Sequence, residues 1–346
     1  MIDCDVHCAP ASLETLAPYL SDYWREYTAT AGIRLVGMAN AYPPGAPTSG
    51  EAVPSDYDAV CQRVLETASP RYVVLNCLTI CEAHRNPYYQ AALASALNDW
   101  VRDEFLARDS RLRASMVVST VDPDDAVAEV ERLGDDPRFV QVLLPIRTDA
   151  PYGNKRYHRL FAAAAEHDLA LGLHAWGRAG HAPTTSGYTL SYLEDYVSNQ
   201  MIAQTHVVSL VSEGVFDRMP GLRVALMECG FAWLPALLWR FDKDWKGVWR
   251  EVPWVKERPS AYVRRHVRVT TAPTHLPTDQ PAQVRELIDM VGAELLMHAS
   301  DFPHNHGASA SALYELLTET AREDVRDANA ATFYRLDRAQ GDEVRV

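Results

Sequence analysis

The stretch Ile2-Asp3-Cys4-Asp5-Val6-His7 opens the chain with a short, largely apolar segment of the length of one buried β-strand. No Gly-rich phosphate loop follows it, so the main sequence signature of a dinucleotide-binding sheet is missing. Similar segments recur along the chain at Tyr72 to Cys77, Leu112 to Ser119, Phe139 to Leu144, Leu169 to His174, Leu222 to Glu228, His266 to Thr271 and Glu294 to Ser300. The chain therefore offers eight candidate strands.

Helical patterns alternate with these strands at Tyr89 to Leu106, Asp124 to Leu133, Tyr157 to Glu166, Phe231 to Trp245 and Pro281 to Met290. Such alternation gives either an α/β barrel or a doubly wound sheet. A count of eight favours the barrel, because a closed sheet has no edge strand. No internal repeat or linker marks a second domain. We therefore predict one α/β domain over residues 1–346, a (β/α)8 TIM barrel.

Two segments, at about residues 26–54 and 175–190, are longer than a minimal barrel needs. The first contains Tyr42-Pro43-Pro44-Gly45-Ala46-Pro47, and the second is rich in Gly, Pro and Thr. They come after the first and the fifth strand, at the barrel end where βα loops carry the active site. We expect both segments to be active-site loop insertions.

Charge and composition limit the partners of this protein. The formal net charge is -13, which opposes binding to nucleic acid or to an anionic membrane. No apolar run reaches the length of a transmembrane helix. The start of the chain lacks the features of a secretory signal, and the six cysteines form no CxxC motif. We expect a cytoplasmic protein with reduced cysteines that acts on a small molecule.

Four chemically active side chains lie at predicted strand ends. Asp5 and His7 alternate on the first strand and so point together into the barrel mouth. His174 closes the fifth strand, and Asp301 follows the eighth. Two imidazoles and two carboxylates suit one divalent metal ion, with Zn²⁺ as the first expectation and Mn²⁺ or Fe²⁺ as alternatives. We predict that Asp5, His7, His174 and Asp301 are its ligands.

Other histidines carry less weight. His206 falls inside a helical run and is expected to pack rather than to bind metal. His298 should face away from the mouth by alternation from Asp301. His304 could hold Asp301 or a substrate oxygen, whereas the motif His304-Asn305-His306 lies in a loop without the alternating geometry of a strand. The triplet Glu82-Ala83-His84 repeats the acidic-x-His pattern at a frequency that composition alone explains.

The quoted segments, together with Arg223 to Pro235 and Ser300-Asp301-Phe302-Pro303-His304, resemble the amidohydrolase superfamily over nearly the whole chain. The nearest branch is the amidohydrolase-2 group, which contains metal-dependent decarboxylases and some lactone hydrolases. The resemblance implies a first-strand ligand pair at Asp5 and His7, a fifth-strand ligand at His174, and an eighth-strand aspartate at Asp301 that also exchanges protons.

Two positions depart from the pattern of this superfamily. Glu228 stands where many relatives carry a sixth-strand histidine, so the role of that histidine does not transfer. The fourth strand ends at Arg147 without the lysine that bridges two metals in binuclear members, which favours a single ion. The resemblance also implies a homodimer. The aromatic segment that contains Trp239, Phe241, Trp245, Trp249 and Trp254 is consistent with a subunit interface, but equally with packing under the insertions.

Three functions stay open at this point. The first expectation is metal-dependent hydrolysis of an amide, cyclic imide or lactone, with Asp301 as proton acceptor, because the carboxylates already offset the charge of the metal and would draw an anionic substrate weakly. The alternative is non-oxidative decarboxylation of an aromatic or unsaturated acid, with Asp301 as proton donor. The second alternative is an inactive ligand-binding barrel. The expected catalytic residues are Asp301, Glu228 and Arg147, and the expected substrate-binding residues are Trp176, Tyr188, His304 and Tyr42.

Overall fold

The computed structural model describes residues 1–34, 52–79, 81–177, 182, 184, 187–277, 279–304 and 309–336. Its centre is one sheet of eight parallel strands in the order β1 to β8, and neighbours in the sheet are neighbours in the sequence. The strands are β1 (Ile2–Cys8), β2 (Tyr72–Cys77), β3 (Leu112–Val117), β4 (Phe139–Arg147), β5 (Ala170–Gly177), β6 (Val224–Met227), β7 (Val267–Thr270) and β8 (Leu296–Met297).

The first and last strands meet and bring the sheet round into a barrel. The backbone N–H groups of Cys4 and His7 donate to the carbonyl oxygens of His298 and Phe302 at 2.9 and 2.8 Å, and the N–H of Asp301 donates to Asp5 O at 3.0 Å. β8 is shorter than the predicted segment, because the chain leaves the ladder with β7 after Met297 but keeps bonding to β1. The predicted (β/α)8 TIM-barrel fold is confirmed.

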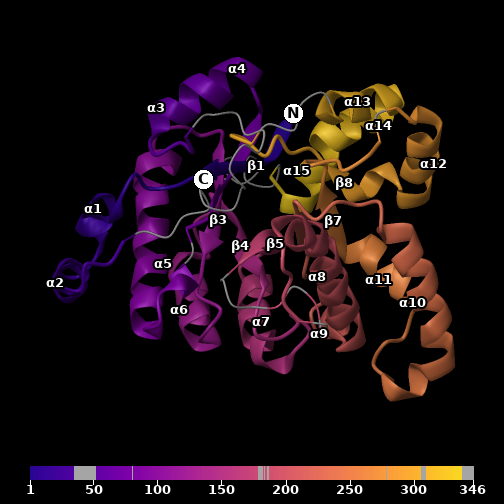
Figure 1. The fold of residues 1–346 in the computed structure, drawn as a ribbon, viewed down its shortest axis with the longest axis horizontal. Coiled ribbons are helices and arrows are strands. Elements are labelled where there is room, and N and C mark those ends of the chain that lie inside the picture. The colour runs from indigo at the N-terminus through magenta and orange to yellow at the C-terminus, as the bar shows by residue number, and fades with distance from the viewer. Residues whose placement is uncertain are drawn as a thin grey trace, which may run out of the picture.

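Helices surround the strands (Figure 1). They are α1 (Leu13–Leu16), α2 (Asp22–Thr30), α3 (Tyr57–Val60), α4 (Glu66–Ala68), α5 (Pro87–Val101), α6 (Pro123–Leu133), α7 (His158–Glu166), α8 (Tyr192–Ser212), α9 (Val215–Arg218), α10 (Leu234–Val248), α11 (Pro259–His266), α12 (Pro281–Val291), α13 (Ser309–Leu316), α14 (Glu319–Glu323) and α15 (Asn329–Tyr334). No helix in the described ranges is long and apolar enough to cross a membrane.

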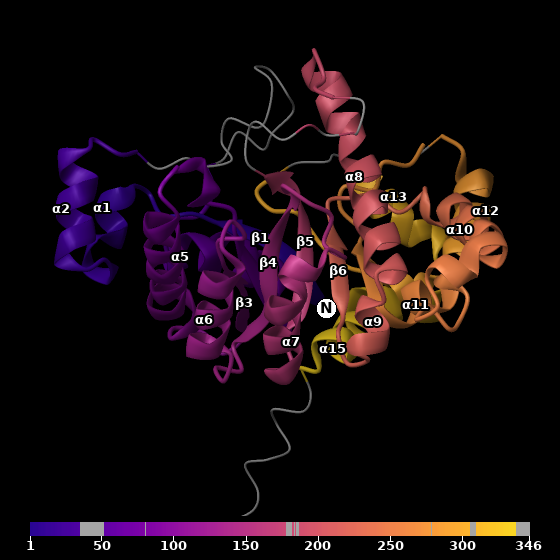
Figure 2. The ribbon, with the colours of Figure 1, turned by 90° about the horizontal axis from the view of Figure 1, so that it is seen from below.

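Local sequence signals explain where the long helices begin. The hydroxyl of Ser191 accepts from the N–H of Glu194, and the Glu194 carboxylate accepts from the N–H of Ser191, a capping box at the start of α8. Figure 2 shows that this end of α8 rises past the carboxyl ends of the strands, whereas α15 lies at the opposite end of the barrel. The two helices therefore mark the two ends of the core.

The two expected loop insertions are only partly covered by the described residues. The last residues of α2 fall at the start of the first one, so residues 26–30 are helical rather than loop. The first residues of the second insertion complete β5, which runs to Gly177. Tyr42 lies outside the described residues, and its predicted role in substrate binding stays a prediction.

Candidate metal centre

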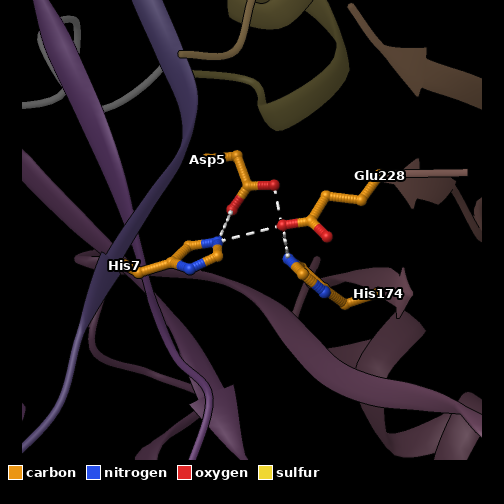
Figure 3. Close-up of side chains that lie close together, drawn as sticks. All are labelled: Asp5, His7, His174 and Glu228. Carbon is orange, nitrogen blue, oxygen red and sulfur yellow. Dashed lines mark ion pairs between the residues drawn. The ribbon is translucent and has the colours of Figure 1, made fainter. Parts of the chain in front are cut away.

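Four ionisable side chains meet at the carboxyl ends of the barrel strands (Figure 3). Asp5 and His7 alternate along β1, so both point into the mouth. His174 lies on β5, and Glu228 directly follows β6. Asp5 and His174 are fully buried, and His7 and Glu228 are 2% and 8% exposed. Residues far apart in the sequence thus form one buried polar cluster.

The side-chain atoms approach one another closely. His7 Nε2 lies 3.2 Å from Asp5 Oδ1 and 3.4 Å from Glu228 Oε1. His174 Nε2 lies 3.3 Å from Asp5 Oδ2 and 3.5 Å from Glu228 Oε1. One potential ligand atom from each of these four residues lies within 4.8 Å of all the others, and a second such group consists of His7, Glu228, Asp301 and His304.

Several of these buried atoms make no hydrogen bond within the described part of the chain. They are Asp5 Oδ2, His7 Nε2, His174 Nε2 and Glu228 Oε1. A buried polar atom normally has a hydrogen-bond partner, since leaving it unpaired costs free energy. Imidazole nitrogens and carboxylate oxygens that converge without bonding one another are the donor set that a divalent cation takes. The cluster therefore has the form of a divalent metal site.

The backbone turns sharply at the two carboxylates that follow strands. Glu228 has a φ of 55° and Asp301 a φ of 57°, both in the left-handed region that residues other than glycine rarely adopt. Backbone conformations of this kind cost free energy and concentrate at functional sites. In both cases the turn comes just beyond the strand, and it leaves the carboxylate beside His7, with Asp301 Oδ1 at 3.1 Å from His7 Nε2.

Asp301 has a direct partner in His304. His304 Nδ1 lies 2.8 Å from Asp301 Oδ1, and the imidazole ring of His304 stands edge-on to that of His7 at 4.7 Å. The carboxylate of Asp301 is buried, whereas the His304 side chain is 10% exposed. His304 is therefore the more exposed partner of the pair, and its imidazole can hold the carboxylate and exchange a proton with it.

The charges of the cluster are strongly coupled. Burial alone would lower the pKa of His7, but Asp5, Glu228 and Asp301 outweigh burial and hold this pKa well above its usual value. His174 shows the same balance, with Glu228 and Asp5 as the raising groups. Burial raises the pKa of Glu228, and the Asp301 carboxylate raises it further. The negative carboxylates thus stabilise positive charge in the cluster, which either protons on the histidines or a bound cation can provide.

The other expected site residues that the structure describes, Arg147, Trp176 and Tyr188, do not belong to the cluster of possible ligands. Arg147 makes a two-pronged ion pair with Asp195, at 2.9 and 2.8 Å, and donates to Asn199 Oδ1 at 2.8 Å, so it ties β4 to α8. The Trp176 ring lies 5.8 Å from that of His174; it is 5% exposed and its Nε1 has no partner among the described residues. Tyr188 is 70% exposed.

A cavity of about 220 Å³ opens beside Glu228. α8 contributes one wall and the loops after β6 and β7 contribute the other. The lining includes the side chains of Tyr196, Asn199, Phe231 and His275. Neither Tyr188 nor Trp176 is among its described lining residues. The cavity is large enough for one small aromatic ring, and Glu228 belongs both to its lining and to the cluster.

His206 and His298, which the sequence analysis did not assign to the metal site, form hydrogen bonds elsewhere in the fold. His206 Nε2 donates to Ile146 O at 2.7 Å, and its Nδ1 accepts from the N–H of Tyr152 at 3.1 Å. His298 Nδ1 contacts the hydroxyl of Tyr314 on α13, away from the cluster. Burial lowers the pKa of His206 to about 4. His206 is therefore a neutral, fully bonded core residue.

Sequence reasoning missed two features of the site. It predicted Glu228 as a catalytic residue but did not foresee its contacts with the two histidines, 3.4 Å from His7 Nε2 and 3.5 Å from His174 Nε2. It did not consider Asn76, whose Nδ2 donates to Asp5 Oδ1 at 2.7 Å. Asn76 stands near the end of β2. A search for any polar residue at a strand end, rather than for imidazole and carboxylate alone, would have found it.

The family model described as Amidohydrolase, Amidohydro_2, matches residues 81–336. The chain belongs to this family. It is an enzyme of the amidohydrolase superfamily, as the resemblance implied. Over 275 residues it is 28% identical to the gamma-resorcylate decarboxylase of Rhodococcus jostii, which covers 71% of this chain and 77% of the relative.

Solved structures share the fold. The 5-carboxyvanillate decarboxylase of Sphingomonas paucimobilis aligns with a TM-score of 0.71 at 21% identity, covering 97% of this chain and 98% of that one. The dihydroxybenzoic acid decarboxylase of Polaromonas sp., solved with manganese and the inhibitor 2-nitroresorcinol, aligns with a TM-score of 0.69 at 19% identity, covering 99% and 98%.

These findings correct the first expectation for the activity, because the named relatives are decarboxylases and not hydrolases. The expectation of hydrolysis was therefore wrong. It assumed that the carboxylates offset the charge of the metal, so that an anionic substrate would be drawn only weakly. A carboxylate that carries a proton for donation offsets less of that charge.

Proposed function

We propose that this protein is a metal-dependent, non-oxidative decarboxylase of a small aromatic carboxylic acid. The observation that carries the proposal is the convergence of four unpaired, buried ligand atoms from Asp5, His7, His174 and Glu228. The named relatives act on hydroxylated benzoic acids, and this supports the same class of substrate. The cavity beside Glu228 supports a ligand with one ring.

One divalent ion, held by Asp5, His7, His174 and Glu228 with Asp301 adjacent, would supply positive charge for the carboxylate and a neighbouring oxygen of the substrate. We propose Mn²⁺ in place of the Zn²⁺ first expected. Carboxylates favour harder ions, and a structural relative was solved with manganese. The three carboxylates Asp5, Glu228 and Asp301 outnumber the charges of a divalent ion by one. In the proposal this excess is offset by the proton that Asp301 donates to the ring carbon.

In this proposal Asp301 is the proton donor. The bond between the ring carbon and the carboxylate carbon breaks, carbon dioxide leaves, and the electron pair that stays on the ring carbon takes the proton of Asp301. His304, which contacts Asp301 Oδ1 at 2.8 Å, returns a proton from solvent to the carboxylate. Glu228 stands in place of the histidine of many relatives and here serves as a ligand.

We propose the following roles for the remaining residues that the sequence analysis named. Arg147 acts by holding Asn199 and α8 in place, and Asn199 lines the cavity. Trp176 does not line the cavity, but its buried indole N–H has no partner among the described residues and its ring lies beside His174, so we propose a contact with the substrate on the His174 side of the cluster. Tyr42 stays a proposed contact from the first insertion, and Tyr188, which is largely exposed, is the weaker of the two.

We also propose a homodimer, but on a different surface from the one first considered. Leu190, two residues before α8, is 97% exposed and Leu193, in its first turn, is 73% exposed; Val197 and Met201 continue this stripe at helical spacing. In the aromatic segment, Phe241 and Trp245 pack against the core, although Trp239 is 64% exposed. Light scattering of the wild type and of a Leu190→Glu, Leu193→Glu double variant tests this assignment; a monomeric wild type would contradict it.

The activity is tested with a panel of hydroxybenzoic acids, including 2,6-dihydroxybenzoate. The enzyme is stripped of metal and reloaded with Mn²⁺, and carbon dioxide release is measured together with loss of the substrate absorbance. We expect release from at least one ortho-hydroxy acid with the Mn²⁺ enzyme, no release with the metal-free enzyme, and release slowed by about 100- to 10,000-fold with Asp301→Asn. Binding of the acids without any release would instead support an inactive ligand-binding barrel.

A further inference from the structure

A line of hydrogen-bonded side chains runs through the barrel interior from Asp5 to the opposite end of the core. Its members after Asp5 are Asn76 on β2, Ser115 on β3, Gln141 on β4 and Tyr334 on α15. None of these side chains is more than 5% exposed. α15 lies at the amino ends of the strands, so the line spans the barrel between its two ends (Figure 2).

The donors along this line all point toward Asp5. The Tyr334 hydroxyl donates to Gln141 Oε1 at 3.0 Å, and Gln141 Nε2 donates to Ser115 Oγ at 2.8 Å. The Ser115 hydroxyl donates to Asn76 Oδ1, and Asn76 Nδ2 donates to Asp5 Oδ1 at 2.7 Å. Because each group is polarised by the one before it, the line stabilises a negative charge at its end.

Such a line is unusual packing for the interior of a barrel. Barrel interiors are filled mainly by branched apolar side chains, and a buried amide is costly unless its hydrogen bonds are satisfied. Neighbouring β5 also leaves space for the line: a Cβ atom on Gly172 would lie 2.7 Å from Gln141 Cδ. Polar side chains therefore replace apolar ones at several adjacent positions of the interior. Their hydrogen bonds hold Asn76 in place as a partner of Asp5 Oδ1.

We propose that Asn76 is a positioning residue of the metal centre. Its amide donates to Asp5 Oδ1 and so directs Oδ2, which has no hydrogen-bond partner among the described residues, toward His174 Nε2 at 3.3 Å. Ser115, Gln141 and Tyr334 fix the orientation of that amide. This role rests on the proposed metal-dependent function, since it concerns how tightly the cluster holds its ion. Mutation of a residue that hydrogen-bonds a metal ligand commonly weakens metal binding by roughly ten- to a hundredfold.

The test compares Asn76→Leu with Asn98→Leu, a matched control. Asn98 is also a fully buried asparagine, and its three hydrogen bonds go to Val117 and Glu129 rather than to the cluster. The dissociation constant for Mn²⁺ is measured by calorimetry, and thermal unfolding of the metal-free protein is measured in parallel. We expect both variants to unfold at lower temperature, but only Asn76→Leu to bind Mn²⁺ more weakly, by about 10- to 100-fold.

Equal Mn²⁺ affinity in Asn76→Leu and the wild type would overturn this role while leaving the proposed function intact. An equal loss in Asn98→Leu would also overturn it, because the effect would then be one of general stability. A wild type that binds no Mn²⁺ would refute the metal-dependent function itself, and this role with it. If Asn76→Leu does not fold, Tyr334→Phe deletes only the far hydroxyl, and we expect it to weaken binding by less than about tenfold; unchanged binding would count against the line.

Discussion

Two buried histidines of this barrel, His174 and His206, show how function differs from structure in the same core. Both nitrogens of His206 have backbone partners, at 2.7 and 3.1 Å. Neither nitrogen of His174 has a hydrogen-bond partner among the described residues, and its Nε2 faces two carboxylates. Burial lowers the pKa of His206 to about 4, whereas Glu228 and Asp5 outweigh burial and raise the pKa of His174. His206, whose two nitrogens are hydrogen-bonded, stabilises the fold. His174, whose nitrogens lack hydrogen-bond partners among the described residues, is available to bind a cation.

The largest effect is expected from Asp301→Asn, which keeps the shape of the side chain and removes its proton chemistry. Loss of a general acid lowers kcat by about 100- to 10,000-fold. Steady-state kinetics with the best acid of the panel would measure this change. The matched change His206→Gln should leave kcat within a few-fold of wild type, roughly. A similar loss in both variants would remove the distinction between the two regions.

His174→Ala should abolish the metal site and leave the fold. We expect Mn²⁺ binding to weaken by more than about 100-fold, since even indirect partners of a metal cost ten- to a hundredfold, roughly. Calorimetric titration with Mn²⁺ gives the affinity, and circular dichroism checks the fold. His206→Gln should bind Mn²⁺ as the wild type does. Retained affinity in His174→Ala would show that this histidine is not a ligand.

The pH dependence of stability should separate the two histidines next. The pKa of His206 is about 4 in the folded protein and about 6.5 in the unfolded chain. As the pH falls from 6.5 toward 4, the unfolded chain binds a proton that the folded protein does not, so the free energy of unfolding decreases. The full difference corresponds to roughly 3 kcal/mol.

Urea unfolding of the metal-free wild type and of His206→Gln over this pH range measures that contribution. The wild type should lose stability more steeply than the variant, because the variant lacks the titrating group. The cluster histidines titrate alike in both proteins and cancel in the difference. Parallel curves would mean that His206 is not held neutral.

The smallest effect is expected from the metal ion on global stability. At a Mn²⁺ concentration 100 times its dissociation constant, a site present only in the folded state adds about 2.7 kcal/mol to the free energy of unfolding. Chelator should reverse this gain in the wild type and in His206→Gln. No gain should occur in His174→Ala. Stabilisation of His174→Ala by Mn²⁺ would point to a site elsewhere.

Much of the fold was accessible from the sequence, because all eight strands appear as short apolar runs separated by helices. The positions of Asp5 and His7 followed from alternation along the first strand, and that of His174 from its place at the end of the fifth. The place of Glu228 in the cluster was harder to predict, because it depends on a left-handed backbone conformation after β6, and hydrophobic periodicity does not indicate such a turn. The partner of Arg147, Asp195, lies 48 residues further on, at the start of α8, where sequence alone gives no pairing.

The central claim is tested most directly by a crystal structure of the protein grown with Mn²⁺, with an anomalous difference map at the manganese edge. The account predicts a single strong peak within bonding distance of Asp5 Oδ2, His7 Nε2, His174 Nε2 and Glu228 Oε1. A map with no peak among these atoms, or with manganese bound only at other positions, would contradict it.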